Sequence, residues 1–542
     1  MLKEIVCDKF KCNGENRGTI YFHSGLNIVL GSESGANSIG KSTFLMIIDF
    51  VFGGNDYIDK LKELQVEIGD HNICFAFQFG DEVYYFSRSN YNHKNVHKCN
   101  SNYEIEDTIT LKEYISFLEI HYDLQFVSFR DAISRFIRIY KRDTLDENNP
   151  LLSHKQENSK SAIKGLLKIN NLYDDIEKQY KLLEETKEKY NLFKKAQEYK
   201  YIPSVKNGSE YKKNEKKIKE LTEKLNNVIF QSSNNLFNLE SFQHDKLLYA
   251  NSKLSKLKIE HSKLTSQLQA IKIDKNFDKD IFEKNLKQLI YFFPNVNFKN
   301  IEDVENFHLK LTNILQEEFL ETEKKIKSNL DFIESEIKNV ENLILEISES
   351  NNLPQLVLKE YAEIDNELRV SKIANKNYIK TRELSDDYKN ANKTLNELVS
   401  QKLQTLQEKI NSEMLKINNK IYDGNKNSPI LSITDSSHYK FFTPKDSGTG
   451  TQYKGVIVFD LAILNITNIP IIVHDSILLK HIENEAIEKI MELYTKTSKQ
   501  IFIAIDKKSS YTEKTAKIIE ENNIINLNSG SEALFGYTWN DK

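Results

Sequence analysis

Glycine is absent between Ser209 and Asp423, and this long stretch contains only two prolines, Pro294 and Pro354. Both residue types interrupt helices and build turns, so their scarcity predicts long, uninterrupted helices. Apolar residues in the stretch recur at alternating steps of three and four, which is the period of a coiled coil, while Lys, Glu and Asn fill the positions between them. The longest regular series is Ile326, Leu330, Ile333, Ile337, Val340, Ile344 and Ile347.

An extended antiparallel coiled coil explains this pattern, and a compact helical bundle with a similar apolar stripe is the alternative. In the coiled coil, an outgoing arm runs from about residue 171 to 273 and a returning arm from about 301 to 421. We therefore assign residues 166–425 to a coiled-coil arm with its distal tip near 275–300. Because a chain of 542 residues is too long for one compact domain, we expect a second structural unit as well.

Other features are scarce too. The cysteines form no CxxC pair, which disfavours disulfides and a structural zinc site. No run approaches the ~18 apolar residues of a membrane helix, and residues 1–10 lack the apolar centre of a signal peptide. The net charge of −4 favours neither DNA nor a membrane as a global partner. We expect a soluble, cytoplasmic protein that makes no membrane contact.

The N-terminal region, residues 1–165, has the pattern of β-rich globular sequence. Residues 25–31 are an apolar strand that leads directly into a glycine-containing loop. Residues 71–79 and 82–88 alternate between apolar and polar on either side of a Gly-Asp pair, which predicts a β-hairpin.

The C-terminal region, residues 426–542, predicts a parallel α/β arrangement. Residues 469–475 and 500–506 look like buried strands, and the helix expected at 482–497 separates them. Neither end of the chain has enough strands for a complete sheet. We therefore predict that the two ends fold together as the lobes of one α/β head, with the coiled coil inserted between them.

The loop after the first apolar strand carries a phosphate-binding pattern, GxxxxGK[ST], from Gly35 to Ser42. In such a loop, backbone N–H groups converge on the β- and γ-phosphates of a nucleotide. Lys41 adds a positive charge there, and the Ser42 hydroxyl is a ligand for Mg²⁺. This predicts that the protein binds ATP and Mg²⁺. The nucleotide-binding residues expected here are Gly35, Asn37, Ser38, Gly40, Lys41, Ser42 and Thr43.

The second half of a nucleotide site is an acidic residue at the end of a buried strand, aimed at the metal. Asp475 fits this role because it follows an apolar strand. The next residue is Ser476, where many ATPases of this kind carry the glutamate that activates water, so fast hydrolysis is in doubt. His474 and Asp506 are the two alternative bases, and a routine structural role is open for each.

A third element is the polar segment 445–452, which precedes the apolar run 455–464. Small residues that open a helix offer free N–H groups and the positive end of the helix dipole to an anion. The alternative is a flexible polar loop that caps the helix.

These three elements and the coiled coil, in this order, resemble the SMC-like branch of ABC ATPases. The resemblance implies that two heads sandwich two ATP molecules, and that the signature of one head completes the site of the other. Lys41, Ser42 and Asp475 would then bind Mg-ATP in their own head, with Lys41, Asp475 and His474 as the catalytic candidates. The signature residues that would act on the partner head are Ser447, Gly448, Thr449 and Gly450.

Two expected family features are missing. Residues 136–139 stand where a Q-loop would be, and they contain no glutamine. The expected tip contains no cysteine, which disfavours the SMC-like repair ATPases with a zinc hook.

A closer resemblance is to the ATPase subunits of bacterial three-component ABC defence systems, which include the Lamassu-type anti-phage systems. It is carried by short motifs at residues 292–294, 307–311, 446–450, 459–461 and 474–476. It implies that Ser476 is usual for the subgroup. It also implies a separate effector subunit, often a nuclease, a small accessory subunit and double-stranded DNA as partners.

A basic run lies close to the expected junction of head and arm. A solvated helix face is its simplest interpretation, and a contact with a DNA backbone is the alternative. The run consists of Arg130, Arg135, Arg138, Lys141 and Arg142. His93, His97 and Cys99 lack a fourth spaced ligand, so we expect no metal there.

Together these patterns predict an ATPase that acts as a switch: nucleotide joins two heads, DNA or a partner is sensed, and an associated effector is controlled in anti-phage defence. We expect hydrolysis to be slow or stimulated by DNA or partners. The alternatives are an SMC-like ATPase of DNA repair or chromosome maintenance, and a scaffold that binds ATP without significant turnover.

Overall fold

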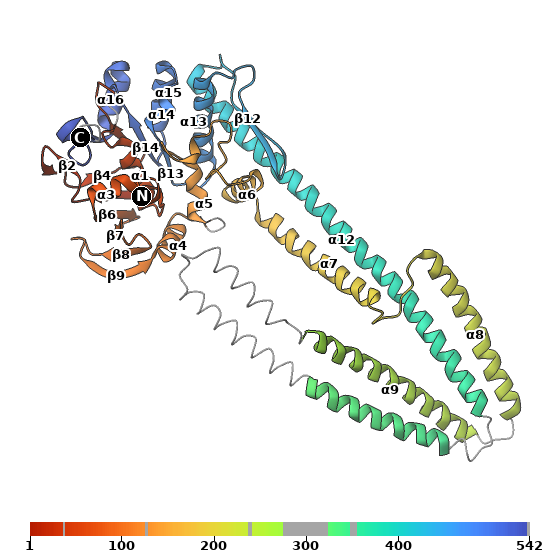
Figure 1. The fold of residues 1–542 in the computed structure, drawn as a ribbon. Coiled ribbons are helices and arrows are strands. Elements are labelled where there is room, and N and C mark those ends of the chain that lie inside the picture. Colours follow the sequence, from red (N-terminus) through yellow and green to blue (C-terminus); the bar gives the residue numbers. More distant parts are fainter. Residues whose placement is uncertain (36–37, 125–127, 237–240, 275–322, 347–354, 539–542) are drawn as a thin grey trace. The chain divides into compact units, whose positions relative to one another are not determined.

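The computed structural model describes residues 1–35, 38–124, 128–236, 241–274, 323–346 and 355–538 (Figure 1). It divides into two compact units. Residues Met1–Glu185 and Lys389–Lys542 form the head unit, and Thr186–Tyr388 form the arm unit. Both divisions lie further out along the arm than the expected boundaries at 165 and 426, because the roots of the arm helices pack into the head.

A five-stranded parallel sheet forms the centre of the head, in the order β10-β13-β14-β5-β15. Its strands are β10 (Ile137–Arg138), β13 (Ile471–His474), β14 (Gln500–Ile505), β5 (Leu26–Leu30) and β15 (Asn523–Asn526). The N-terminal strand β5 lies between two strands from the C-terminal end of the chain. This confirms that both ends of the chain build one head. Every residue of β13 and β14 is buried, as expected for strands covered on both faces.

A second sheet of the head is antiparallel and comes from the N-terminal lobe alone. Its order is β4 (Ile20–Tyr21), β1 (Leu2–Val6), β6 (Asn72–Phe79), β7 (Glu82–Ser89), β8 (Asn95–Cys99) and β9 (Ile105–Thr110). The predicted hairpin is β6-β7, which turns at Gly80 with φ of 61°. Strands β8 and β9 were not predicted, because their sequences are mostly polar.

Helix α1 (Lys41–Val51) joins the two sheets through the core. The ring of Phe52, directly after the helix, lies 5.2 Å from that of Phe77 in β6 and 6.4 Å from that of Phe502 in β14. Burial on several sides fixes the start of α1, where the phosphate-binding pattern lies. The other helices of the head are α2 (Asp56–Asp59), α3 (Lys62–Ile68), α4 (Leu111–His121), α5 (Phe129–Ile133), α6 (Ser159–Ile169), α13 (Thr449–Ile466), α14 (Ser476–Leu479), α15 (Asn484–Tyr494) and α16 (Glu513–Glu521).

The last turns of α12 (Gln355–Tyr422) belong to the core of the head. The apolar residues that recur at steps of three, four or seven in this part are all buried: Leu403, Leu406, Ile410, Ile417 and Ile421. The side-chain amide of Asn411 exchanges two hydrogen bonds of 2.9 Å with the backbone of Leu431. Leu431 lies in the hairpin of β11 (Ile430–Asp435) and β12 (His438–Phe442), so this hairpin is fastened along the root of the arm.

The arm unit contains pairs of antiparallel helices, as predicted. From α7 (Asp174–Glu198), Gln197 donates to Thr381 of α12 at 2.6 Å. From α8 (Gly208–Leu236), Asn214 donates to Asn375 of α12 at 2.8 Å. Partner numbers in α12 fall as numbers in α7 and α8 rise, which shows that these helices run antiparallel. Hydrogen bonds between polar side chains and a partner helix also fix their register.

A second helix pair in the arm unit consists of α9 (Ser241–Asp274) and the helical residues 323–346. Lys253 pairs with Glu336 at 3.0 Å, and the seam residues Ile326, Leu330, Ile333 and Val340 are buried as predicted. Arg369 of α12 also donates to Ser255 of α9 at 3.0 Å. A single outgoing helix paired with a single returning helix does not account for this contact, because residues 253–255 of α9 contact both Glu336 and Arg369. The predicted arm is therefore antiparallel, as expected, but has more helix pairs than the prediction gave. The expected tip at 275–300 lies outside the described residues. Within the described ranges, no helix is both long and apolar enough to cross a membrane.

Candidate functional site

The predicted nucleotide-binding residues gather at the carboxyl ends of the parallel strands. In a parallel sheet the loops after neighbouring strands meet at one edge, which is where such folds bind ligands. The loop after β5, the start of α1 and the residues after β13 line a pocket of about 480 Å³. Of the predicted residues, Ser38, Gly40, Lys41, Ser42, Thr43 and Asp475 line this pocket. Gly35 lines a neighbouring pocket, and Asn37 lies outside the described residues.

The phosphate loop depends on glycine at the start of α1. Gly40 has φ of 101°, a conformation that L side chains rarely adopt, and an added Cβ would lie 2.5 Å from the Cβ of Leu534. No side chain caps the first turn of α1. The backbone N–H groups of Ser42 and Thr43 belong to that turn, where N–H groups have no partner within the helix and can bind an anion in the pocket.

Asp475 lies at the end of β13 with a defined orientation. Its Oδ2 accepts the backbone N–H of Tyr140 at 2.9 Å, and its Oδ1 accepts the Ser476 hydroxyl at 3.3 Å. Each carboxylate oxygen has further lone pairs, and the Ser42 hydroxyl lines the same pocket. Carboxylate and hydroxyl oxygens are the hard ligands that Mg²⁺ prefers, and the pocket volume falls in the range of small-molecule sites, about 300–1,000 Å³. The residues therefore fit a metal-bound nucleotide.

Lys41 is joined to an acidic residue at the end of the neighbouring strand. Its Nζ lies 2.6 Å from Oδ1 of Asp506, which follows β14. A Cβ added to Gly31 would lie 2.0 Å from that Oδ1, so only glycine leaves space for the pair. The pattern of a buried strand followed by Asp is the same signal that identified Asp475, and it places both carboxylates at one edge of the sheet.

His474 lies outside the pocket and does not face the phosphate loop. Its side chain is fully buried, with Nδ1 2.6 Å from the Tyr494 hydroxyl and Nε2 3.1 Å from Oδ2 of Asp460. Successive side chains of a strand point to opposite faces, so the residue before Asp475 faces α13. With both ring nitrogens engaged in the core, His474 is not retained as a candidate base. Asp506 is the candidate that remains at the site.

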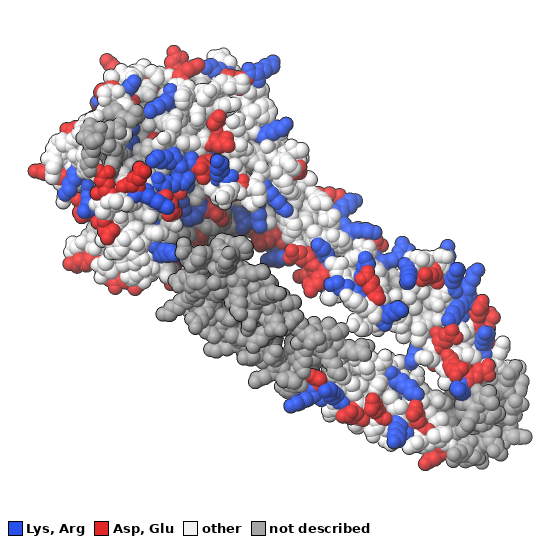
Figure 2. Space-filling view, viewed as in Figure 1, with Lys and Arg blue, Asp and Glu red and all other residues white. Residues whose placement is uncertain are grey.

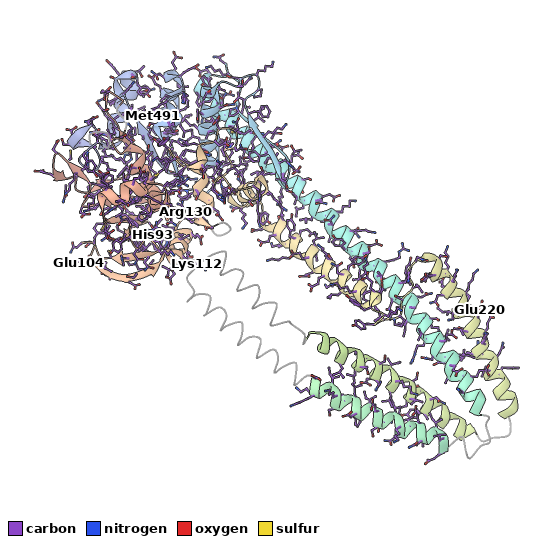
Figure 3. The ribbon with its side chains drawn as sticks, viewed as in Figure 1. His93, Glu104, Lys112, Arg130, Glu220 and Met491 are labelled. Atoms are coloured by element: carbon purple, nitrogen blue, oxygen red, sulfur yellow. The ribbon has the colours of Figure 1, made fainter. Side chains whose placement is uncertain are left out.

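Four residues of the basic run are paired with carboxylates and three of them are buried, so the predicted solvated face and the alternative DNA contact are both wrong for those three. Arg130 (Figure 3) and Arg142 bind Asp49, at 2.8 and 2.6 Å. Burial alone would raise the pKa of Asp49, but the two guanidinium groups outweigh it and hold the pKa below its ordinary value. The sequence could not show this, because none of the partners is near in the chain.

The other two buried arginines of the run also have carboxylate partners. Arg135 binds Glu157 at 3.4 Å, and the fully buried Arg138 binds Asp460 at 2.8 Å. Only Lys141 remains near an open site, where it lines the nucleotide pocket. On the face shown in Figure 2, Lys and Arg side chains are interspersed with Asp and Glu side chains. Among the described residues, no group of His, Cys, Asp and Glu is arranged to hold a metal, and this includes His93, His97 and Cys99.

The signature residues form a separate, exposed surface of the head. Gly448 is the N-cap of α13, and Asp446 accepts its backbone N–H at 3.0 Å and the Thr451 hydroxyl at 2.8 Å. Ser447, Gly448 and Thr449 are exposed, whereas Gly450 is half-buried. None of the four signature residues lines the pocket of its own phosphate loop. The structure therefore does not bring the two motifs together within one head.

Each of the two parts of the site lies in a region that matches a known protein family. Residues 4–231 match the family model of an AAA domain. The AAA domain match includes the phosphate loop, and a second match at residues 417–539 includes the signature, Asp475 and Asp506. The second family is described as an uncharacterised protein conserved in bacteria (DUF2326). No curated protein matches the chain. The parallel sheet built from both ends of the chain and the inserted helices show an α/β head with an antiparallel coiled-coil insertion, and the AAA domain match covers the lobe that carries the phosphate loop.

Solved structures of Smc heads are also similar to this chain. A Pyrococcus yayanosii Smc head domain with a coiled coil and joint is 15% identical with a TM-score of 0.48, and the match covers 98% of this chain and 96% of that one. A Pyrococcus furiosus Smc head domain bound to the C-terminal domain of ScpA is 13% identical with a TM-score of 0.37, covering 96% and 91%.

Proposed function

We propose that this protein is an ATPase whose head binds Mg-ATP and joins a second head when ATP is bound. The observation that carries the proposal is the pocket itself, in which Lys41, Ser42 and Asp475 are brought together from two lobes of the chain. Lys41 would bind the β- and γ-phosphates, and Ser42 and Asp475 would hold Mg²⁺. Bound Mg²⁺ would neutralise phosphate charge and position the phosphates for cleavage.

The exposed signature supports the two-head arrangement. Ser447 and Gly448 lie at the start of α13, away from the pocket of their own head. Backbone N–H groups at the start of a helix of this length can bind a phosphate presented by another molecule. A second head that carries bound ATP would present such a phosphate, so nucleotide would join the two heads.

Two biological roles fit such an ATP-dependent switch. We propose that it senses DNA or a partner and controls an effector subunit in anti-phage defence. DNA repair or chromosome maintenance is equally compatible with the site. Neighbouring genes separate the two: an effector nuclease and a small accessory protein favour defence, and repair genes favour maintenance.

A third hypothesis is a scaffold that binds ATP without hydrolysing it, and the residues beside the phosphate loop give it some support. Ser476 stands beside Asp475, and the carboxylate of Asp506 is paired with Lys41. Steady-state hydrolysis, measured with and without linear double-stranded DNA, separates the switch from the scaffold. We expect slow hydrolysis that DNA stimulates and that Lys41→Ala abolishes. Tight ATP binding without hydrolysis under all conditions would favour the scaffold.

Native mass spectrometry with a non-hydrolysable ATP analogue tests the two-head arrangement. We expect the wild type to dimerise with the analogue and Ser447→Arg to remain monomeric. Ser498→Arg is the matched control, because Ser498 is exposed and precedes β14, at the opposite edge of the parallel sheet. Dimers of Ser447→Arg that form as readily as those of the wild type would rule out the role of the signature in the partner site.

A further inference from the structure

The loop after β14 is held beside the phosphate loop by contacts from two of its residues. Asp506 pairs with Lys41, and Ser509 donates its backbone N–H to the Glu33 carboxylate at 3.2 Å and its hydroxyl to the same carboxylate. These contacts join two loops that are far apart in the sequence. They fix the position of Lys507, which lies between the two anchors.

Lys507 reaches the first glycine of the phosphate loop. A Cβ added to Gly35 would lie 2.8 Å from Cε of Lys507 and 3.7 Å from its Nζ. Glycine at position 35 therefore makes room for this lysine as well as for the turn. The phosphate pattern thus has two lysines beside it, one from α1 and one from the loop after β14.

The backbone of Lys507 is in an unfavourable conformation. Its φ is 54°, in the left-handed region that residues with a side chain rarely adopt. Such conformations persist where the surrounding structure holds them, and they concentrate at functional sites. Here the result is a lysine directed to the phosphate loop, whereas its neighbour Lys508 pairs with Glu520 at 2.6 Å.

The charge of Lys507 differs from that of its neighbours in its pairing. Among the described residues, no carboxylate forms an ion pair with it, while Lys41 and Lys508 each have one. Lys507 also lines a second pocket of about 460 Å³, together with Gly35, Ser476 and Asp506. Ser476 and Lys480 line both pockets, so the second pocket adjoins the nucleotide pocket.

The order of the strands indicates which part of a nucleotide Lys507 would meet. Strand β14 lies between β13, which carries Asp475, and β5, which leads to the phosphate loop. Asp475 would hold the metal that neutralises phosphate charge, and Lys41 would bind the β- and γ-phosphates. A residue placed between these two is therefore beside the terminal phosphate.

We propose that Lys507 is a second phosphate-binding cation of this site, which contacts the terminal phosphate of ATP and makes the head discriminate ATP from ADP. This inference rests on the proposed function of the pocket. It adds a residue outside the phosphate pattern, at a position where only the tertiary structure brings a lysine to the nucleotide.

Nucleotide affinity tests the proposal with three variants of the full chain. Lys507→Asn removes the charge and keeps a residue that tolerates the left-handed conformation. Lys507→Arg keeps the charge, and Lys508→Asn removes the neighbouring charge. Dissociation constants are measured in Mg²⁺ by fluorescent-nucleotide displacement, for a non-hydrolysable ATP analogue and for ADP.

We expect Lys507→Asn to weaken binding of the ATP analogue about tenfold and binding of ADP less than about threefold. Lys507→Arg should retain most of the affinity, and Lys508→Asn should change neither constant. Unchanged binding of the ATP analogue to Lys507→Asn, or an equal loss for both nucleotides, would overturn the proposal. A wild-type protein that binds neither nucleotide would instead overturn the proposed function, and this inference with it.

Discussion

The ammonium of Lys41 and the carboxylate of Asp506 lie 2.6 Å apart, with only 8% and 11% of their side chains exposed. Lys41 starts the helix after the phosphate loop, and Asp506 ends the strand next to it. A phosphate group that binds Lys41 must share the ammonium with this carboxylate. We therefore expect the affinity for ATP to depend on a competition between phosphate and the Asp506 carboxylate for Lys41.

Replacing the carboxylate tests this competition. Asp506→Asn should tighten binding of a non-hydrolysable ATP analogue about three- to tenfold, because the charge of Lys41 is no longer neutralised. Isothermal titration calorimetry gives the affinity. If Asp506 is also the base that activates water, the rate of hydrolysis should fall by about 100-fold or more in the same variant. Weaker binding of the analogue would contradict the competition.

The buried pair of Arg138 and Asp460 should be a large contributor to the stability of the head. Both side chains are fully buried, and the guanidinium binds the carboxylate through two hydrogen bonds of 2.8 and 2.9 Å. Arg138→Met leaves the buried carboxylate without its guanidinium partner and with only the His474 ring beside it. We expect this to cost about 3–5 kcal/mol in urea unfolding followed by circular dichroism.

Two further variants separate the pair from its individual members. Arg138→Met combined with Asp460→Leu should recover most of the loss, because no buried charge is left without a partner. Arg382 is exposed, so Arg382→Met should change stability by less than about 0.5 kcal/mol. A single variant as stable as the wild type would show that the pair is not needed.

A buried lysine between α13 and the root of α12 predicts a pH-dependent stability. Burial lowers the pKa of Lys454 from 10.5 to about 8, and its Nζ donates to Asn418 at 2.9 Å. The folded head therefore binds fewer protons than the unfolded chain between about pH 8 and 10.5. The contribution of this group to stability rises over that window, and it is lost as the pH falls toward 8.

Lys454→Met should remove this dependence. We expect the variant to be about 1–2 kcal/mol more stable than the wild type at pH 7, because no charge is buried. The difference should shrink as the pH rises toward 10, as measured by thermal unfolding at several pH values. Lys440→Met, at an exposed position of β12, is the control that should show no such trend. A difference that is independent of pH would contradict the prediction.

The signature segment packs against the loop after α14 through a glycine. A Cβ added to Gly450 would lie 2.3 Å from the backbone oxygen of His481, and backbone atoms cannot move aside as a flexible side chain can. Gly450→Ala should therefore destabilise the head by about 1–3 kcal/mol. At Gly448 the nearest atom to an added Cβ is a side-chain oxygen at 3.3 Å, so Gly448→Ala should be much milder. Equal thermal stability of the two variants would argue against the close packing.

Local patterns in the sequence determined much of this protein. The phosphate loop needs only its own glycines, Lys41 and Ser42, and it forms where a short strand meets a helix. The hairpin β6-β7 follows from alternation around Gly80, and the long helices follow from the absence of helix breakers. Each of these features depends on interactions between residues that are close in the chain, so the sequence alone was enough to predict it.

The tertiary structure alone decided how charges are distributed. Arg138 looked like part of an exposed basic run, but its partner Asp460 lies in α13 and buries it completely. His474 looked like a candidate base, but the pleat of β13 turns it into the core. Lys507 showed no motif at all, yet it reaches Gly35. Burial and pairing depend on partners in other elements, from 14 residues away for His474 to 322 for Arg138, and no local pattern records them.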